Sequence, residues 1–269
     1  MKCRFCYATY DSILPARARR GIPLEEARRL IDALSAAGFK KITFAGGEPT
    51  LCPWLPETAR HAKSRGLVTG VVTNGSRLTP GLIDSLAPHL DWLTLSIDSA
   101  SPAVNARTGR AVAGLRPLAV SGLAETAGQF RRRGVRLKVN TVVTRHNSGE
   151  RLIGVITRIG PERWKVMRAL RIEGENDRDF GDLEATDRQF ARFLAVNREV
   201  PAGTVRVPEN NEDMIASYVM VDPAGRFVDN AAGRYRVSAP ILRAGVEAAY
   251  RQVTHDPDTF KRRGGRYEW

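Results

Sequence analysis

Cysteine is rare in this chain, whose 269 residues include only Cys3, Cys6 and Cys52. An odd number of cysteines, two of them spaced C-x-x-C, argues against the disulfide framework of small secreted domains and favours metal or redox chemistry. Long apolar runs are missing too, since nothing approaches the roughly 18 consecutive apolar residues of a membrane span. No signal-peptide pattern opens the sequence. We therefore expect a cytoplasmic protein with no membrane contact.

Acidic residues are outnumbered, because 29 Asp and Glu stand against 42 Lys and Arg, which leaves a formal charge of +13. Such an excess favours polyanionic partners, either nucleic acid or a small phosphorylated molecule. The arginine run at 131–133 is more typical of a solvated helix face than of a nucleic-acid contact. We expect a small phosphorylated substrate and no stable complex with nucleic acid.

Apolar periodicity alternates between helix-like and strand-like segments along most of the chain. Leu24, Ala27, Leu30 and Leu34 repeat at helical spacing, for example, and a β-rich run follows at 41–45. Strands that alternate with helices imply a parallel sheet with right-handed crossovers, and we expect a partial (β/α)6 barrel. The expected helices are 24–37, 54–63, 82–86, 118–132, 151–158, 187–200 and 241–251, and the expected strands are 41–45, 67–73, 91–97, 135–143 and 163–172.

The character of the sequence changes after about residue 184. Two short β-rich runs, 218–221 and 226–228, are joined by Asp222-Pro-Ala-Gly225 and predict a hairpin. A helix and a basic tail follow. We expect residues 1–184 to form the partial barrel and residues 185–269 to form a C-terminal extension that covers the barrel mouth.

Two motifs near the start carry chemistry. The pair Cys3-x-x-Cys6 alone fits zinc sites, thioredoxin-like enzymes and iron–sulfur proteins alike. The run Gly46-Gly-Glu-Pro49, at the end of the first expected strand, narrows the choice. Together the motifs resemble the radical S-adenosylmethionine (SAM) superfamily, in which C-x-x-x-C-x-x-C holds a [4Fe-4S] cluster and G-G-E-P holds the methionine end of SAM.

The resemblance implies a cofactor site with a definite chemistry. Three thiolates leave one iron open to SAM, and one electron then cleaves SAM to a 5′-deoxyadenosyl radical. A glycine pair lets the backbone approach the SAM amino group, and Glu48 is placed to accept a hydrogen bond from that group. The implied cluster ligands are Cys3 and Cys6, and the implied SAM-binding residues are Tyr7, Gly46, Gly47, Glu48, Asn74 and Ser96.

Further segments narrow the resemblance to the viperin-like radical SAM enzymes, an antiviral nucleotide-modifying family. The resemblance covers nearly the whole chain. It implies conversion of CTP, or alternatively GTP or UTP, to a 3′-deoxy-3′,4′-didehydro nucleotide that terminates polymerase chains. It also implies an electron donor of the flavodoxin or ferredoxin type, and we expect a monomer. The segments are Lys41 to Pro49, Leu95 to Ser99, Asn105 to Arg110, Lys138 to Asn140, Arg163 to Val166, Ile172 to Asn176, Val207 to Asn210, Ser217-Tyr218 and Lys261 to Tyr267.

Cations on the expected strands independently favour a triphosphate site. Alternate strand residues share a face, so Lys138 and Asn140 point together, as do Arg163 and Lys165. Two such pairs inside a barrel call for an anion, because unpaired buried charge is costly.

The resemblance implies individual roles in substrate binding and catalysis. Asn140 holds the ribose or base, Tyr218 donates the last electron and proton, and Lys41 shares in catalysis. Arg263 belongs to a flexible lid beside Gly264-Gly265. The implied substrate-binding set is Lys41, Arg110, Lys138, Asn140, Arg163, Lys165 and Arg263.

The sequence departs from the family pattern in two places. Counting back four residues from Cys3 passes Met1, so the first cluster cysteine and the first barrel strand are expected upstream of the numbered sequence. Cys52 follows the G-G-E-P turn and is expected to be a buried structural thiol rather than a replacement ligand. Ala45 stands where the family pattern has a serine that contacts SAM.

Two alternatives stay open. A radical SAM enzyme that acts on peptides usually carries further cysteines for auxiliary clusters, and none follows Cys52. The second alternative is a barrel that has lost its cluster and only binds nucleotides or RNA.

Overall fold

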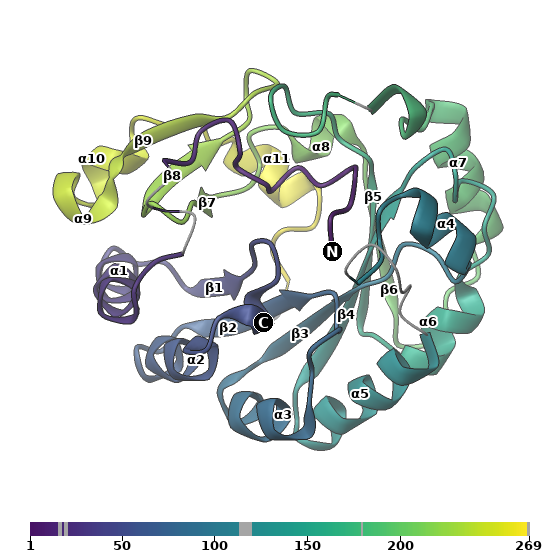
Figure 1. The fold of residues 1–269 in the computed structure, drawn as a ribbon, viewed down its shortest axis with the longest axis horizontal. Coiled ribbons are helices and arrows are strands. Elements are labelled where there is room, and N and C mark those ends of the chain that lie inside the picture. Colours follow the sequence, from purple (N-terminus) through teal and green to yellow (C-terminus); the bar gives the residue numbers. More distant parts are fainter. Residues whose placement is uncertain (16–17, 19–20, 113–119, 179, 268–269) are drawn as a thin grey trace.

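A curved six-stranded parallel sheet organises the protein (Figure 1). The computed structural model describes residues 1–15, 18, 21–112, 120–178 and 180–267. The strands lie in sequence order, which is the arrangement of an α/β barrel that has not closed. They are β1 (Lys41–Phe44), β2 (Val68–Thr73), β3 (Trp92–Ser96), β4 (Arg136–Val143), β5 (Arg163–Arg168) and β6 (Val205–Glu209).

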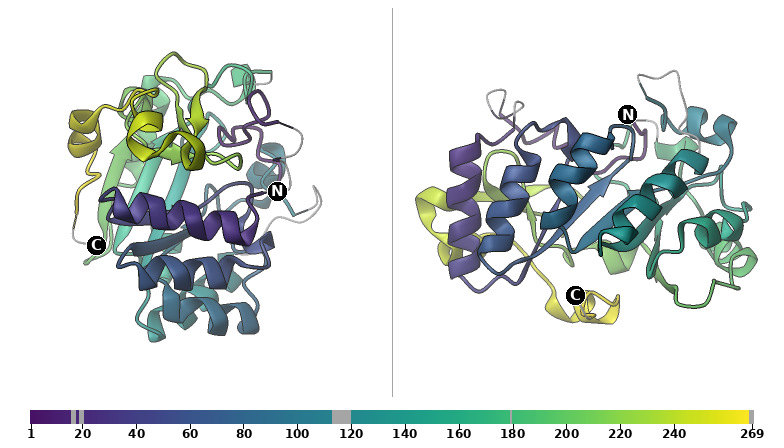
Figure 2. Two further views of the ribbon diagram at one scale, coloured as in Figure 1. Left: turned by 90° about the vertical axis from the view of Figure 1, so that its left-hand side faces the viewer. Right: turned by 90° about the horizontal axis from the view of Figure 1, so that it is seen from below.

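Helices cover the outer face of the sheet, one of them before β1 and the others between successive strands, and Figure 2 shows several of them side by side. Their apolar stripes bury large side chains such as Phe130 and Phe193 against Trp164 and other strand residues. Thr186 begins the last of these helices with a capping box formed with Gln189. The helices are α1 (Leu24–Ala36), α2 (Leu55–Ser64), α3 (Pro80–Leu86), α4 (Pro102–Arg107), α5 (Val120–Arg132), α6 (Ile153–Ile159) and α7 (Asp187–Val196).

The two faces of each strand have different roles. On β4, Leu137, Val139 and Val143 are buried under the helices, whereas Lys138 and Asn140 alternate with them and are partly exposed on the inner face. On β5 the same alternation places Arg163 and Lys165 on the inner face. The prediction that each polar pair shares a face is therefore confirmed.

A second layer spans the open side of the barrel between β1 and β6 (Figure 1). This layer contains a three-stranded sheet. Residues 1–14 pack against it, and Tyr10 and Ile13 belong to one apolar cluster with Val228 and Tyr235. Phe227 and Ile241 pack instead against Leu30 and Leu34 of α1. The elements of this layer are β7 (Met220–Val221), β8 (Arg226–Asp229), β9 (Arg236–Pro240), α8 (Asn211–Met214), α9 (Ile241–Ala244), α10 (Val246–Tyr250) and α11 (Pro257–Arg262).

The prediction of a partial α/β barrel is confirmed, and so is the hairpin at 218–228. Strands β6 and β9 and helices α4, α8 and α11 were not predicted. The predicted division at residue 184 falls between β5 and β6, which pair side by side. The single helix expected at 241–251 is two short helices, because Gly245 has a φ of +84° that breaks the helix. Residues 118 and 119 of another expected helix lie outside the described residues.

The strand expected at 163–172 ends early, at Arg168, and Ile172 begins a separate turn. None of the helices in the described part of the chain combines the length and apolar character needed to cross a membrane.

Replacing Phe193 with alanine tests how α7 holds the barrel. Phe193 is fully buried and its ring meets that of Trp164 edge to face at 6.2 Å. Phe193→Ala should lower the free energy of unfolding by about 3–5 kcal/mol in urea titrations, because the cavity left behind cannot refill. Val196→Ala, at an exposed site on the same helix, is the control and should cost far less. Equal losses would contradict this packing.

Candidate active site

The carboxyl ends of β1, β2 and β3 carry the first group of polar residues. Glu48 follows β1, and its carboxylate accepts hydrogen bonds from the Thr50 amide at 3.2 Å, the Asn74 amide at 2.8 Å and the Thr73 hydroxyl. These bonds join the end of β1 to the end of β2. Gly46 has a φ of +120°, a conformation that side chains disfavour, which explains a glycine at the start of this turn.

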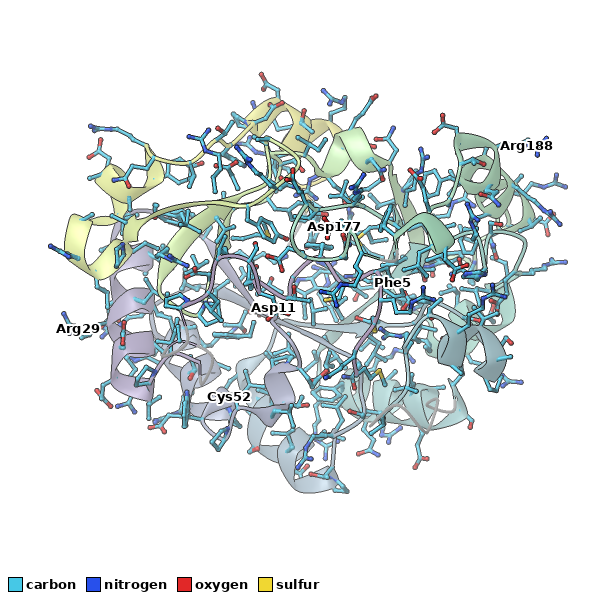
Figure 3. The ribbon with its side chains drawn as sticks, turned by 45° about the horizontal axis from the view of Figure 1, so that its top comes forward. Phe5, Asp11, Arg29, Cys52, Asp177 and Arg188 are labelled. Carbon is cyan, nitrogen blue, oxygen red and sulfur yellow. The ribbon has the colours of Figure 1, made fainter. Side chains whose placement is uncertain are left out.

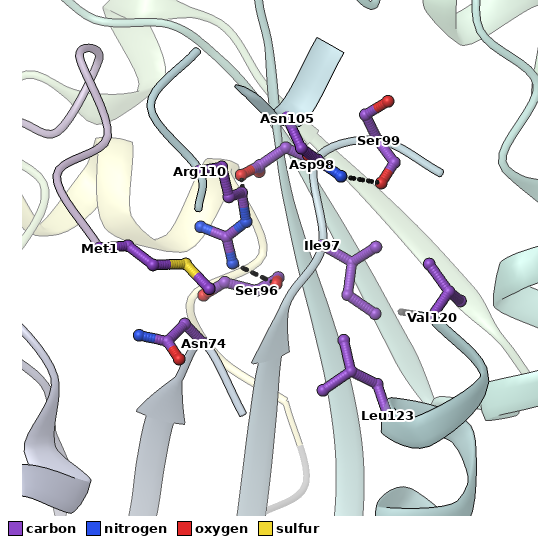
Figure 4. Close-up of a pocket in the computed structure, with 10 residues that line it drawn as sticks. All are labelled: Met1, Asn74, Ser96, Ile97, Asp98, Ser99, Asn105, Arg110, Val120 and Leu123. Carbon is purple, nitrogen blue, oxygen red and sulfur yellow. Dashed lines mark hydrogen bonds and ion pairs between the residues drawn. The ribbon is translucent and has the colours of Figure 1, made fainter. Parts of the chain in front are cut away.

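A pocket lies beside this turn, and Asn74, Ser96 and Arg110 all line it (Figure 4). The buried Arg110 guanidinium pairs with Asp98 at 2.9 Å and donates to the Ser96 carbonyl oxygen. Its Nη1 atom lies 3.7 Å from the Cys3 sulfur. Arg110 was expected among the phosphate-binding cations, but the structure places it with Cys3 and Ser96 at the predicted cofactor end.

The loop that carries Cys3 and Cys6 is a tight turn, in which the Cys6 amide donates to the Cys3 carbonyl oxygen at 3.0 Å. Both thiols are free, and burial raises their pKa values, that of Cys6 to about 11. Figure 3 shows Cys52 well apart from Phe5, which lies between the two loop cysteines. Cys52 is thus not placed to join them.

The run Ile172 to Asn176 holds this loop in place. The Asn176 amide donates to the Phe5 carbonyl oxygen at 3.1 Å, inside the C-x-x-C turn. The Glu175 carboxylate accepts from the backbone amides of Asp11 at 2.9 Å and Ser12 at 3.2 Å, and from the hydroxyls of Thr9 and Ser12. This loop is therefore positioned by residues that lie more than 160 positions away in the sequence.

Cations form a second group inside the barrel, around the rings of Trp92 and Tyr267. The Lys138 ammonium lies 4.2 Å from the centre of the Trp92 ring and 4.1 Å from that of Tyr267, and the Arg163 guanidinium lies 4.0 Å from Tyr267. Lys41 and Lys138 both donate to the Tyr267 hydroxyl. Burial, together with the neighbouring cations, lowers the pKa of Lys138 to about 5 and that of Lys41 to about 8.

A third group surrounds Glu209, which is fully buried at the end of β6. Its carboxylate pairs with the Lys165 ammonium at 2.8 Å and the Arg263 guanidinium at 3.0 Å, and it accepts the Tyr218 hydroxyl. Arg263 follows α11 and is itself buried, so the structure shows it docked on Glu209 and on the Ser217 carbonyl oxygen. The charge of Arg263 is committed to a carboxylate within the protein.

Strand register brings the groups together. Ser96, Asn140 and Lys165 are direct neighbours across β3, β4 and β5, and they form one layer of the inner face. Lys138 and Arg163 lie one layer nearer the amino ends of the strands. The Asn140 side chain is half-buried in this layer. The predicted cofactor end and the cations are thus adjacent.

Sequence reasoning did not select Asp98, Trp92, Glu209 or Tyr267 as site residues. Glu209 could have been found from its spacing, because Val205, Val207 and Glu209 alternate and β6 places them on the inner face beside Lys165. Tyr7 and Tyr218 both pack against the apolar cluster around Tyr10. No sequence pattern indicated that Tyr267 fills the space between the lysines.

Comparison with known proteins decides the family. Residues 1–159 match the model of the radical SAM superfamily. The chain belongs to this superfamily. It is similar to an S-adenosylmethionine-dependent nucleotide dehydratase of Lacinutrix mariniflava (42% identity over the whole chain and 56% of that protein) and to one of Flammeovirga pacifica (39%, the whole chain and 92% of that protein). The chain thus spans about half the length of the first of these relatives.

The viperin-like resemblance is also confirmed. The chain is 34% identical over its whole length to the nucleotide dehydratase RSAD2 of Danio rerio, of which it covers 74%. Among solved structures, it resembles Streptococcus suis SuiB bound to S-adenosylmethionine (TM-score 0.68, 16% identity, 99% of this chain and 65% of that one). It also resembles anSMEcpe with bound AdoMet (TM-score 0.61, 14% identity, 85% and 70%). These two structures support the radical SAM fold alone.

The cofactors of this superfamily are a [4Fe-4S] cluster and SAM. The site fits them, because Cys3 and Cys6 present two free thiols on one turn and Arg110 places a positive charge beside them. Cys3 and Cys6 supply two of the three thiolates of the family motif. Among the described residues, no group of three or more His, Cys, Asp or Glu could hold a metal ion.

The hydrogen bonds of Glu175 hold residues 9–12, the segment that follows the two loop cysteines. Glu175→Gln replaces one acceptor oxygen with an amide nitrogen, so hydrogen–deuterium exchange at residues 9–12 should become about tenfold faster. Glu173→Gln, an exposed neighbour, is the control and should leave this exchange unchanged. If both variants exchange like the wild type, Glu175 does not hold the loop.

Proposed function

We propose that this protein removes water from the ribose of a nucleoside triphosphate, with CTP as the first candidate and GTP or UTP as alternatives. The product is the 3′-deoxy-3′,4′-didehydro nucleotide, a chain terminator that suits antiviral defence. The observation that carries the proposal is the layer of Ser96, Asn140 and Lys165, which joins the pocket beside the cysteines to the buried cations. The names of the relatives point to the same reaction.

The cations suit a triphosphate better than a nucleoside or a monophosphate. Lys41, Lys138 and Arg163 converge on one region, and burial lowers their pKa values, with neighbouring cations adding to the effect. A polyanion bound there would restore charge balance through several charge-assisted hydrogen bonds. Because these cations face the inside of the barrel, a flexible phosphate chain suits them better than folded nucleic acid.

Different residues of the chain bind SAM, bind the substrate and supply the final electron. When bound, the cluster and SAM supply the 5′-deoxyadenosyl radical that takes the ribose 4′ hydrogen. The turn Gly46 to Glu48, with Asn74 and Ser96, holds SAM, and Arg110 serves this end rather than the phosphates. Asn140 holds the ribose or base between SAM and the cations. Tyr218 supplies the final reducing equivalent, and Lys41 binds and assists at the phosphate end.

The remaining partners follow from the same chemistry. We include an electron donor of the flavodoxin or ferredoxin type, a monomeric state and a cytoplasmic location in the proposal. Free thiols at all three cysteines support a reducing compartment.

The substrate class is tested with the reduced, cluster-loaded protein under anaerobic conditions. With SAM and a triphosphate it should form 5′-deoxyadenosine and a nucleotide lighter by one water, both read by mass spectrometry, and the monophosphate should react poorly. Lys138→Met should weaken triphosphate binding by about 1.5–3 kcal/mol without loss of thermal stability, since methionine avoids the cost of burying the Lys138 amine, which its lowered pKa reflects.

Arg132→Met, at an exposed position on α5, is the matched control. A monophosphate that reacts as well as the triphosphate, or an unchanged affinity in Lys138→Met, would contradict the phosphate site.

A further inference from the structure

The carboxylate of Glu209 occupies an unusual place for a charged group. It is completely buried, yet Lys165 at 2.8 Å and Arg263 at 3.0 Å both contact its Oε1 atom. Burial acts to raise the pKa of Glu209, but the two cations outweigh burial and hold that pKa below its usual range. Glu209 is therefore kept ionised inside the protein, and its second oxygen, Oε2, is left to meet Tyr218.

The direction of the hydrogen bond between Tyr218 and Glu209 is fixed by chemistry. The Lys165 ammonium can only donate, and it approaches the Tyr218 hydroxyl oxygen at 3.0 Å. The Glu209 carboxylate can only accept, so the single phenol proton of Tyr218 lies on the Glu209 side. Arg263 stacks on the Tyr218 ring at 3.8 Å and holds the ring in this orientation. The phenol proton thus points at a base within the protein.

This arrangement suits a phenol that gives up an electron. An oxidised phenol is a strong acid, so its electron leaves most easily when an acceptor takes the proton at the same time. Direct transfer of a hydrogen atom to a substrate would instead require the O–H bond to point at that substrate. In the structure the O–H bond points at Glu209, so electron and proton have separate destinations.

Resting on the proposed function, we infer that Glu209 is a positioning residue that receives the Tyr218 proton while Tyr218 gives its electron to the substrate radical. The radical at C4′ gains one electron, the 3′ C–O bond breaks, the C3′–C4′ double bond forms, and the departing hydroxide takes one solvent proton to leave as water. Tyr218 becomes a neutral tyrosyl radical and Glu209 becomes a carboxylic acid. A flavin or iron–sulfur electron donor returns one electron to Tyr218, whose proton returns from Glu209.

Residues 257–263 of the C-terminal segment contribute to the proposed proton transfer, because they carry Arg263, which contacts Glu209. Arg263 follows α11, and its contacts with Glu209 and with the Ser217 carbonyl oxygen fasten that segment to β6 and to the residue before Tyr218. Undocking would remove one of the two cations that keep Glu209 ionised. Tyr218 is therefore fully prepared only when residues 257–263 are in place.

The inference is tested with Glu209→Gln, which keeps the size of the side chain but cannot take up the proton. The variant should still form 5′-deoxyadenosine with SAM and a triphosphate, while the ratio of dehydrated nucleotide to 5′-deoxyadenosine falls by about 100-fold, the usual worth of a proton-accepting group. Tyr218→Phe should lower the same ratio, and the double variant should be no worse than either single variant. A wild-type ratio in Glu209→Gln would overturn the inference.

A second readout does not depend on turnover. Glu209 raises the pKa of the Tyr218 phenol, after the larger effect of burial. Glu209→Gln should therefore lower the pH at which tyrosinate absorbance appears, and the difference should vanish in a Tyr218→Phe background. Glu209→Asp, which retains a carboxylate, should recover part of both the ratio and the titration. If Glu209→Gln unfolds, a wild-type ratio in Tyr218→Phe would overturn the inference equally.

The proposed function and the inference fail in different ways. If the wild type forms no dehydrated nucleotide from any triphosphate, the proposed function is wrong, and the role inferred for Glu209 is overturned with it. If the wild type forms the product and Glu209→Gln forms it equally well, the function stands and only the inference is wrong.

Discussion

Partly buried positive charge is the constraint on which this structure depends. Lys138, Arg163 and Lys165 alternate with core residues on β4 and β5, so the strands that build the core also direct cations into the barrel. Glu209 balances Lys165 and Arg263, while the rings of Trp92 and Tyr267 lie against the others. Such a group costs folding free energy, as the lowered lysine pKa values indicate. An anionic ligand that binds there recovers that cost.

The two ends of the site are held by different means. At the cofactor end, Glu175 and Asn176 fasten the cysteine loop, and Arg110 joins it to the end of β3. At the cationic end, the C-terminal segment supplies Arg263 and Tyr267. The sheet itself contributes the layer of residues between the two ends. The two ends of the site thus come from parts of the chain that are distant in sequence and are joined across β3, β4 and β5.

Local patterns predicted most of the sheet and the shared inner face of Lys138 and Asn140. Alternation on β4 and the Gly46 to Pro49 turn are local signals, and both were interpreted from sequence. Strand β6 was not predicted, because it is short and contains Pro208. It lies at the edge of the sheet with Val205 exposed, so neither its alternation nor its apolar content is strong. The place of Arg110 and the partners of Glu209 depend on which long side chains meet in space. No spacing in the sequence predicts these side-chain contacts.

Proton uptake on binding is the measurement that tests whether these cations form a site for a polyanion. In the free protein Lys138, with a pKa of about 5, is neutral near neutral pH, and Lys41, with a pKa of about 8, is partly so. Contact with phosphate raises both values, so binding takes up protons and affinity falls as pH rises above the free pKa values. Calorimetry of CTP binding at about pH 8, in two buffers of different ionisation enthalpy, should show net proton uptake. Binding with no uptake, or with proton release, would contradict the account.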